Sequence, residues 1–193
     1  MCCTHFKMPR LIIILFFFIA LFDAFCGQKP KGKAFKETLV NKTVDSLLRD
    51  PVLLDSIPIK ALGWTNDYEH IFSIDQISEL DSIISAFEKE TTNEIAIVTI
   101  ERSLISKESF DSLTLAIAKN WGVGKKAKNN GVLIGISTGL RMIRIQNGYG
   151  IEAKLTNAET KKIIDDIILP EFKKGDYFKG TKSGLLALMQ KIR

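Results

Sequence analysis

The amino-acid sequence predicts an α/β protein, a three-layer α/β/α sandwich in which helices cover both faces of a small mixed sheet. Two observations lead to this class. The nearly all-apolar segment 94–100 is followed by a helical pattern and then by a second apolar segment, 132–136. This succession favours a right-handed crossover and parallel pairing of the two strands. Segment 141–147 alternates apolar and polar residues after a tight turn, so it should pair antiparallel with the second strand.

Residues 1–26 are predicted to be a secretory signal. Lys7 and Arg10 precede the wholly apolar segment 11–22, which is too short to span a bilayer comfortably because about 20 residues are needed. Three endings stay open: cleavage after Cys26, a lipoprotein signal that leaves Cys26 lipidated, or an uncleaved anchor. The protein is therefore expected to be exported to the periplasm or cell envelope, with a membrane surface as a contact near its N-terminus.

Composition narrows the chemistry of the domain that follows. All three cysteines, Cys2, Cys3 and Cys26, lie in the signal, so disulfides, zinc–thiolate sites and cysteine nucleophiles are excluded from the core. His70 is the only histidine beyond the signal, so a general base would be this residue or a carboxylate. The net charge of +5 is modest and no aromatic residues interleave with the lysines. Nucleic acid is therefore not an expected partner.

The part of the chain before the first confident strand is predicted to hold a linker, a loop and a helix. Residues 27–62 are a polar linker with a short helical stretch, and residues 63–193 form the folded domain. The domain should begin with a polar and aromatic loop, 63–69. Ser73 and Gln76 then form a capping-box signature that begins a helix.

A second helix and a turn are predicted between the strands. Ser106 is expected to cap the helix 107–121, and the glycines that follow should end it. The turn between the second and third strands is 138–140, where Gly139 is free to take a positive φ.

Two helices are predicted after the hairpin. Thr156 and Glu159 form another capping box, for a helix that ends near Pro170. A last helix should cover much of 176–192, with Asp176 more simply a helix cap than a ligand.

Two glycine-bearing loops, 129–131 and 148–152, flank the hairpin and suggest a ligand site. A hairpin returns the chain to the edge at which it began, and parallel pairing brings 91–93 to that edge as well. The helix that follows Thr156 also starts there and adds backbone N–H donors. The sequence therefore predicts a site at the amino ends of the two parallel strands.

Several motifs carry a family resemblance that spans residues 63–193. In order, they are Asn66-Asp67, EIAIVTI, WGVGKKAKNNGVLIGIS, NGYGIEAKLT and PEFKKGDYFKG. The most specific pieces are Asn130-Gly131, Gly148-Tyr149-Gly150 and Gly175-Asp176-Tyr177. Together they resemble the TPM domain, a family that includes thylakoid-lumen proteins of photosystem II repair and many bacterial envelope proteins. The resemblance implies an extracytoplasmic α/β/α sandwich.

The resemblance also implies a function. Members are linked to acid-phosphatase activity, divalent-cation binding or assistance to membrane complexes. We therefore expect a protein that acts mainly by binding, in maintaining or modulating a membrane-associated protein complex. A cation-dependent phosphatase and an inert scaffold are the alternatives, and no nucleophile in a recognisable setting decides whether the protein is an enzyme.

The resemblance further implies a set of site residues. Asp67 and Glu152 match acidic positions of the family motifs and are the expected ligands of Ca²⁺ or Mg²⁺, which prefer oxygen atoms. The other expected ligand-binding residues are Asn66, Asn130, Gly131, Gly148, Tyr149, Gly150 and Thr156. Plainer interpretations stay open: Asp67 could form a turn, Glu152 could be a solvated charge, and the glycines could serve the backbone alone.

Overall fold

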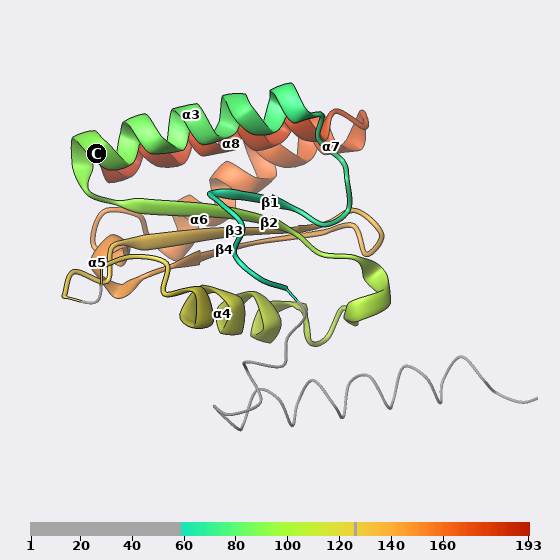
Figure 1. Cartoon of the computed structure of the whole chain (residues 1–193), viewed down its shortest axis with the longest axis horizontal. Helices are drawn as coiled ribbons and strands as arrows, with labels where there is room; N and C mark the ends of the chain where they lie inside the picture. Colours follow the sequence, from blue (N-terminus) through green and yellow to red (C-terminus); the bar gives the residue numbers. More distant parts are fainter. Residues whose placement is uncertain (1–58, 126) are drawn as a thin grey trace, which may run out of the picture. The chain divides into compact units, whose positions relative to one another are not determined.

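The computed structural model describes residues 59–125 and 127–193, so the predicted signal and nearly all of the predicted linker lie outside the described residues. The described chain forms a four-stranded mixed sheet with the order β1-β2-β3-β4 (Figure 1). Strands β2 and β3 run parallel and β4 runs antiparallel to β3, which confirms the predicted pairing. Strand β1, which was not predicted, pairs parallel with β2. The strands are β1 (Thr65–Asp67), β2 (Glu94–Thr99), β3 (Gly131–Ser137) and β4 (Met142–Asn147).

Helices cover both faces of the sheet, which confirms the predicted three layers (Figure 1). Helix α4 (Phe110–Trp121) packs on one face. The opposite face is covered by α3 (Ile74–Thr91) and α8 (Tyr177–Ile192), which lie side by side. The remaining helical segments are η2 (Arg102–Leu104), α5 (Tyr149–Glu152), α6 (Asn157–Ile163), η3 (Ile164–Ile168) and α7 (Leu169–Lys173). No helix in the described ranges is long and apolar enough to cross a membrane.

The core divides between the two faces because side chains of a strand alternate. On β3, every residue is buried; Ile134 and Ile136 pack with α3 and α8, whereas Leu133 packs on the α4 side. Full burial of an aliphatic side chain of this size contributes roughly 1.5–3 kcal/mol. Strand β3 therefore packs against the helices on both faces of the sheet. This packing positions the loops at the two ends of the sheet.

The predicted helix caps are largely confirmed. The capping boxes of Ser73 with Gln76 and of Thr156 with Glu159 are both complete. The Asp176 side chain accepts a hydrogen bond from the Lys179 backbone N–H at 3.0 Å, as expected of a cap. The prediction for Ser106 is wrong: α4 begins at Phe110, and no side-chain cap precedes it.

The turn between β3 and β4 also differs from the prediction. Gly139 does not take a positive φ; instead Arg141 does, with φ 55°. A side chain at position 139 would lie 2.8 Å from Arg102 Cβ, so the glycine is needed for a close approach and not for its φ. The left-handed conformation therefore falls on a charged residue.

The helix predicted to end near Pro170 instead continues to Lys173 through a π-helical segment. Proline has no backbone N–H and cannot complete the regular hydrogen-bond pattern of a helix. The π segment Ile164–Ile168 lies immediately before Leu169-Pro170 and changes the register at this point. The helical chain then resumes as α7, which brings Phe172 beside α8.

The Glu159 carboxylate ties α6 to α8 and should make this contact sensitive to acid. A hydrogen bond from Lys191, and others from Thr156, lower the pKa of Glu159 from 4.5 to about 2. Its stabilising contribution is thus present above the ordinary pKa and is lost as the pH falls toward the folded value. We expect the stability difference between the wild type and Glu159→Gln, measured by urea unfolding, to narrow as the pH is lowered through this window. A difference that stays constant with pH would contradict the assignment.

Candidate functional site

The two glycine-bearing loops lie together at the amino ends of β2 and β3, as the sequence predicts. Glu94 pairs with Gly131, and Val132 pairs with Asn147. The Gly148 N–H donates to the Gly131 carbonyl at 2.8 Å, and the Gly150 N–H donates to the Asn129 carbonyl at 3.0 Å. The inferred geometry of this edge is therefore confirmed.

The glycines at this edge are in direct backbone contact, which leaves no space for a ligand between the loops. A Cβ atom on Gly131 would lie 2.0 Å from the Val123 carbonyl oxygen. One on Gly148 would lie 2.2 Å from the Asn129 carbonyl oxygen, and one on Gly150 would lie 2.0 Å from that of Lys128. Such distances are far below van der Waals contact. The glycines allow three chain segments to pack backbone against backbone.

The polar residues of this edge mostly serve the same packing. Asn130 is buried; its Oδ1 accepts from the Lys125 N–H at 2.9 Å and its Nδ2 donates to the Thr92 carbonyl at 2.6 Å. The Thr156 hydroxyl is engaged in the capping box of α6. Only Tyr149 and Glu152 among the predicted site residues at this edge project freely, and Tyr149 is 81% exposed.

Asn66 and Asp67 lie at the other end of the sheet, which the sequence did not predict. Residues 65–67, predicted as part of a loop, form edge strand β1, and Asp67 pairs with Thr99, the last residue of β2. At about 3.3 Å per residue, five steps along β2 separate Asp67 from the Glu152 edge by roughly 17 Å. Asn66 is buried, accepts from the Leu62 N–H at 2.6 Å and donates to the Ile97 carbonyl at 3.2 Å.

These positions do not fit a Ca²⁺ or Mg²⁺ ion shared by Asp67 and Glu152. An ion of this kind takes oxygen ligands at 2.0–2.6 Å and cannot bridge two ends of a sheet. Asp67 instead accepts from the Thr99 hydroxyl at 2.7 Å and from the Phe72 N–H at 2.8 Å. Across residues 59–125 and 127–193 there is no group of three His, Cys, Asp or Glu side chains that could hold a metal ion.

Replacement of Asp67 should therefore act on stability. Asp67→Ala leaves the Phe72 N–H and the Thr99 hydroxyl without their acceptor, so we expect a loss of about 2 kcal/mol in the free energy of unfolding. Glu152→Ala, at an exposed position, should change it by less than about 0.5 kcal/mol. Urea unfolding of both variants with and without Ca²⁺ checks this; equal losses would refute the structural role of Asp67.

The carboxyl end of the sheet holds a hydrogen-bonded network that begins at Asp67. The Thr99 hydroxyl donates to Asp67 and accepts from the Glu69 N–H at 2.8 Å. The Glu69 carboxylate in turn accepts from the Thr138 N–H at 2.9 Å, the Thr138 hydroxyl at 3.1 Å and the Gly139 N–H at 3.3 Å. The network thus links β1 and β2 to the β3–β4 turn and holds the turn that presents Arg141.

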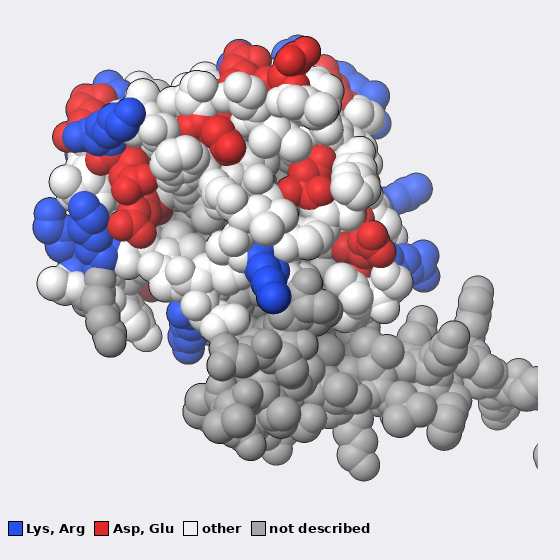
Figure 2. Space-filling model, viewed as in Figure 1, with Lys and Arg blue, Asp and Glu red and all other residues white. Residues whose placement is uncertain are grey.

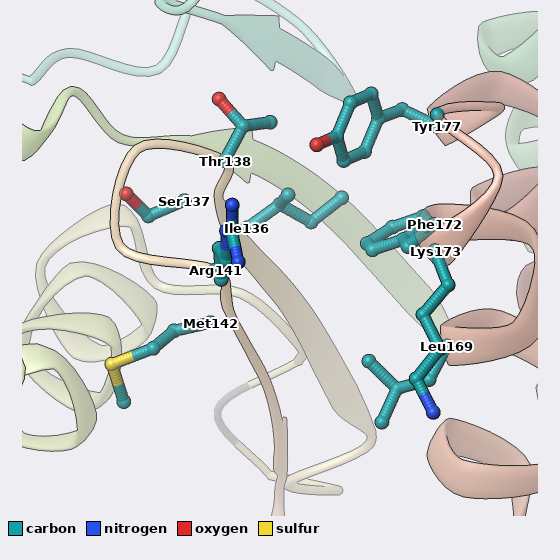
Figure 3. Close-up of a pocket in the computed structure, with 10 residues that line it drawn as sticks. Ile136, Ser137, Thr138, Arg141, Met142, Leu169, Phe172, Lys173 and Tyr177 are labelled. Atoms are coloured by element: carbon teal, nitrogen blue, oxygen red, sulfur yellow. The ribbon is translucent and has the colours of Figure 1, made fainter.

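A cleft of about 620 Å³ lies beside this turn. Its size falls within the range of small-molecule sites, and its place at the carboxyl ends of parallel strands is the usual one in open α/β sheets. One wall comes from the end of β3 and the turn, and the other comes from α7 and the start of α8 (Figure 3). The lining residues are Ile136, Ser137, Thr138, Arg141, Met142, Leu169, Phe172, Lys173, Gly175 and Tyr177.

The side chains of the cleft combine an apolar floor with a cationic rim. Figure 3 shows Ile136 pointing toward Phe172, and the Tyr177 hydroxyl pointing toward Thr138. Ser137 and Met142 point away from the α7 wall, so they contribute mainly backbone (Figure 3). This geometry leaves an apolar surface bordered by a phenol.

The two cations of the rim, Arg141 and Lys173, are both exposed, and neither forms an ion pair with any described residue. The nearest acidic residue along α7, Glu171, is already paired with Lys174 at 2.8 Å and Lys179 at 3.3 Å. The hydrogen bond from Lys174 lowers the pKa of Glu171, so this carboxylate stays charged and engaged. The lining of the cleft contains no acidic side chain.

One sequence signal pointed to this cleft. Gly175-Asp176-Tyr177 is among the most specific motifs of the chain, and Gly175 and Tyr177 line the cleft. Glu69 and Arg141 were missed, because their roles depend on a turn and a loop that are 70 residues apart in sequence but hydrogen-bonded in the fold.

Fold and cleft define a small α/β/α domain with a cleft at the carboxyl edge of its sheet. The model of the TPM domain family matches residues 65–191, and the chain belongs to this family.

Solved structures agree with the family. The N-terminal domain of a Porphyromonas gingivalis protein is 31% identical with a TM-score of 0.60, over 66% of this chain and 80% of that one. The BA42 protein of Bizionia argentinensis is 19% identical with a TM-score of 0.56, over 65% and 83%, and shows the fold alone. No curated protein matches the chain.

Proposed function

We propose that this TPM-domain protein is exported to the cell envelope and acts mainly by binding, and that the cleft beside the β3–β4 turn takes the anionic end of a partly apolar ligand. The observation that carries the proposal is the pairing of an acid-free cationic rim, Arg141 and Lys173, with an apolar floor. An anion recovers Coulomb energy at either cation, since neither Arg141 nor Lys173 forms an ion pair with a described residue. An adjoining apolar group replaces water on the floor.

The shape of the floor supports a ligand with an apolar part. Ile136 of β3 and Leu169 and Phe172 of α7 come from opposite walls and face one space. Burial of apolar surface there contributes about 25 cal/mol per Å². A small inorganic anion would bind at the cations of the rim and leave the apolar floor hydrated. It should therefore bind more weakly than an amphiphile with the same head group.

In the cell, the anionic group would belong to a component of a membrane-associated protein complex, which the domain maintains or modulates. The predicted signal in residues 1–26 supports this placement because it directs the domain to the compartment where such complexes expose their envelope-facing parts. A membrane protein that copurifies with the wild type and is lost from a cleft variant would identify the complex.

Phosphate-ester hydrolysis is the second candidate, since the matching family model is named for a phosphatase. The same rim would hold a phosphoryl group. The Thr138 hydroxyl, which donates to the Glu69 carboxylate at 3.1 Å, is the one hydroxyl of the cleft lining placed on a carboxylate that could remove its proton. The Glu69 carboxylate is at the same time bonded to the backbone N–H groups of Thr138 and Gly139, which hold it in place beside this hydroxyl.

Calorimetric titration with three probes tests the proposal. Octyl phosphate carries both features, inorganic phosphate carries only the charge, and octyl glucoside carries only the apolar chain. Below its micellar concentration, octyl phosphate should bind at least 10-fold more tightly than either other probe. Equal affinities would refute the combined site. Release of inorganic phosphate from octyl phosphate, read by phosphorus NMR in the presence of Mg²⁺, would make the protein an enzyme.

A further inference from the structure

At the opposite end of the sheet, the described residues of the loop 122–130 and the segment 148–154 form one surface, here called the lysine edge. Their backbones are joined by the hydrogen bond from the Gly150 N–H to the Asn129 carbonyl and by the close approach of Gly150 to Lys128. By sequence, the two segments hold four lysines, Lys125, Lys126, Lys128 and Lys154, and one acidic residue, Glu152. The Glu94 carboxylate, which accepts from the Gly124 N–H at 2.8 Å, adds a second acid to this edge, so the local balance is 4 − 2 = +2. Lys154 Nζ donates to the Ile192 and Arg193 carbonyl oxygens at 3.2 and 2.7 Å, whereas Lys125 and Lys128 form no ion pair with a described residue.

The described lysines of this loop are presented by a hydrogen-bonded turn. The Lys128 and Asn129 N–H groups both donate to the Lys125 carbonyl at 2.8 Å, so residues 125 and 128 are one helical turn apart. The Lys125 N–H is in turn fixed to the buried Asn130 side chain at 2.9 Å. Both lysines are exposed, and neither forms an ion pair with a described residue. Lys128 Nζ donates to the Thr92 hydroxyl at 3.0 Å, a neutral partner.

An aromatic side chain projects from the same surface. Tyr149 is 81% exposed and is covalently next to Gly150, whose Cα packs against the Lys128 carbonyl. A tyrosine ring exposed to this extent contributes little hydrophobic free energy to the fold. Exposed tyrosine beside lysines is the combination found at membrane–water interfaces, where the ring sits among head groups and the amines meet lipid phosphates.

We infer that the lysine edge is a docking surface for a membrane that contains anionic lipids. Charge complementarity and the exposed ring both fit this partner. Figure 1 shows that α5 and the loop before β3 lie at the left end of the domain, whereas α7 and the β3–β4 turn lie at the right. At that left end, Figure 2 shows Lys and Arg side chains with Asp and Glu side chains beside them. Docking through the lysine edge therefore turns the carboxyl-end cleft away from the lipid surface.

The inference is independent of the proposed function, since it uses other residues at the other end of the sheet. Each lysine close to an anionic surface strengthens attachment about fivefold, and salt screens the effect within a Debye length of about 8–10 Å. Two lysines exchanged for glutamates should thus weaken docking on the order of 100-fold or more. Glu152 opposes the attraction, so Glu152→Gln should strengthen it.

The test uses the full chain in lipid nanodiscs, because the N-terminal segment then contributes equally to every variant. Spin-labelled lipid is included in discs of phosphatidylcholine alone or with 30% phosphatidylglycerol, and paramagnetic relaxation of backbone amides is measured by NMR. We expect relaxation at 127–130 and 149–151 to be several-fold faster in the anionic discs than in neutral discs. The double variant Lys125→Glu/Lys128→Glu should abolish the difference.

A matched control carries the same change of charge at the other end of the domain. Arg102 and Lys107 are exposed and follow β2, so Arg102→Glu/Lys107→Glu should leave the relaxation pattern unchanged. Tyr149→Ser should weaken it in both lipid mixtures. Equal relaxation in neutral and anionic discs, relaxation centred on another surface, or equal losses in the two double variants would each overturn the inference.

Discussion

Gly131→Ala should destabilise the protein more than any exposed substitution, by about 3 kcal/mol or more. The new methyl group would lie 2.0 Å from the Val123 carbonyl oxygen and 2.4 Å from its carbon. Backbone atoms cannot rotate aside as a side chain can, so the strand start or the loop 122–130 must shift as a unit. Urea unfolding followed by circular dichroism gives the free-energy difference directly.

Gly63→Ala is the matched control for this prediction. A Cβ atom at position 63 would have Asp81 Oδ2, at 3.8 Å, as its only neighbour within 4 Å, and the backbone does not take a positive φ there. The change should therefore stay within about 1 kcal/mol of the wild type. If Gly131→Ala were tolerated as well as Gly63→Ala, the two loops would not be in backbone contact, and the amino end could again admit a ligand.

The double variant Arg141→Glu/Lys173→Glu should weaken the binding of octyl phosphate on the order of 100-fold. Two attractions of an exposed cation for an anion are lost and two repulsions replace them, each contributing about 0.5–1 kcal/mol. Neither residue is paired with an acidic group of the domain, so the fold should be unaffected. Titration calorimetry measures the affinity, and the unfolding midpoint verifies the fold.

Reversing the charge of two lysines outside the cleft distinguishes recognition at the cleft from attraction by the net charge of the domain. Lys161 and Lys162 are exposed residues of α6, outside the cleft lining, and their exchange for glutamate changes the charge of the domain equally. This control should reduce the affinity less than about threefold. A loss as large as that of the cleft variant would show that the anion responds to the overall charge.

Three of the four strands and the capped starts of α3, α6 and α8 were predictable because their signals are local. Strand β3 is a continuous apolar run, and the capping boxes lie within four consecutive residues. Strand β1 gave no such signal. Its residues Thr65, Asn66 and Asp67 are polar, and they become a strand only because the edge of β2 offers pairing, as in the bond from the Ile97 N–H to the Trp64 carbonyl at 2.7 Å.

Because strand β1 was not predicted, Asp67 and Glu152 were expected to lie at the same end of the sheet. With 63–69 read as a loop, nothing in the sequence placed Asp67 at one end of the sheet and Glu152 at the other. The cleft could not be predicted either, since its walls approach only through helix packing. A Cβ atom on Gly180 would lie 2.6 Å from Phe172 Cδ1, so the α7 wall depends on a glycine of α8. Such contacts have no periodic signature.

We propose that ligand recognition belongs to the carboxyl end of the sheet, whereas the amino-end glycines serve the packing of the backbone. Backbone amide chemical shifts recorded during a titration with octyl phosphate test it most directly. We predict that the largest shifts fall on residues 138–142 and 172–177, with little change at 129–131 and 148–152. Shifts centred on the two glycine-bearing loops would contradict the claim.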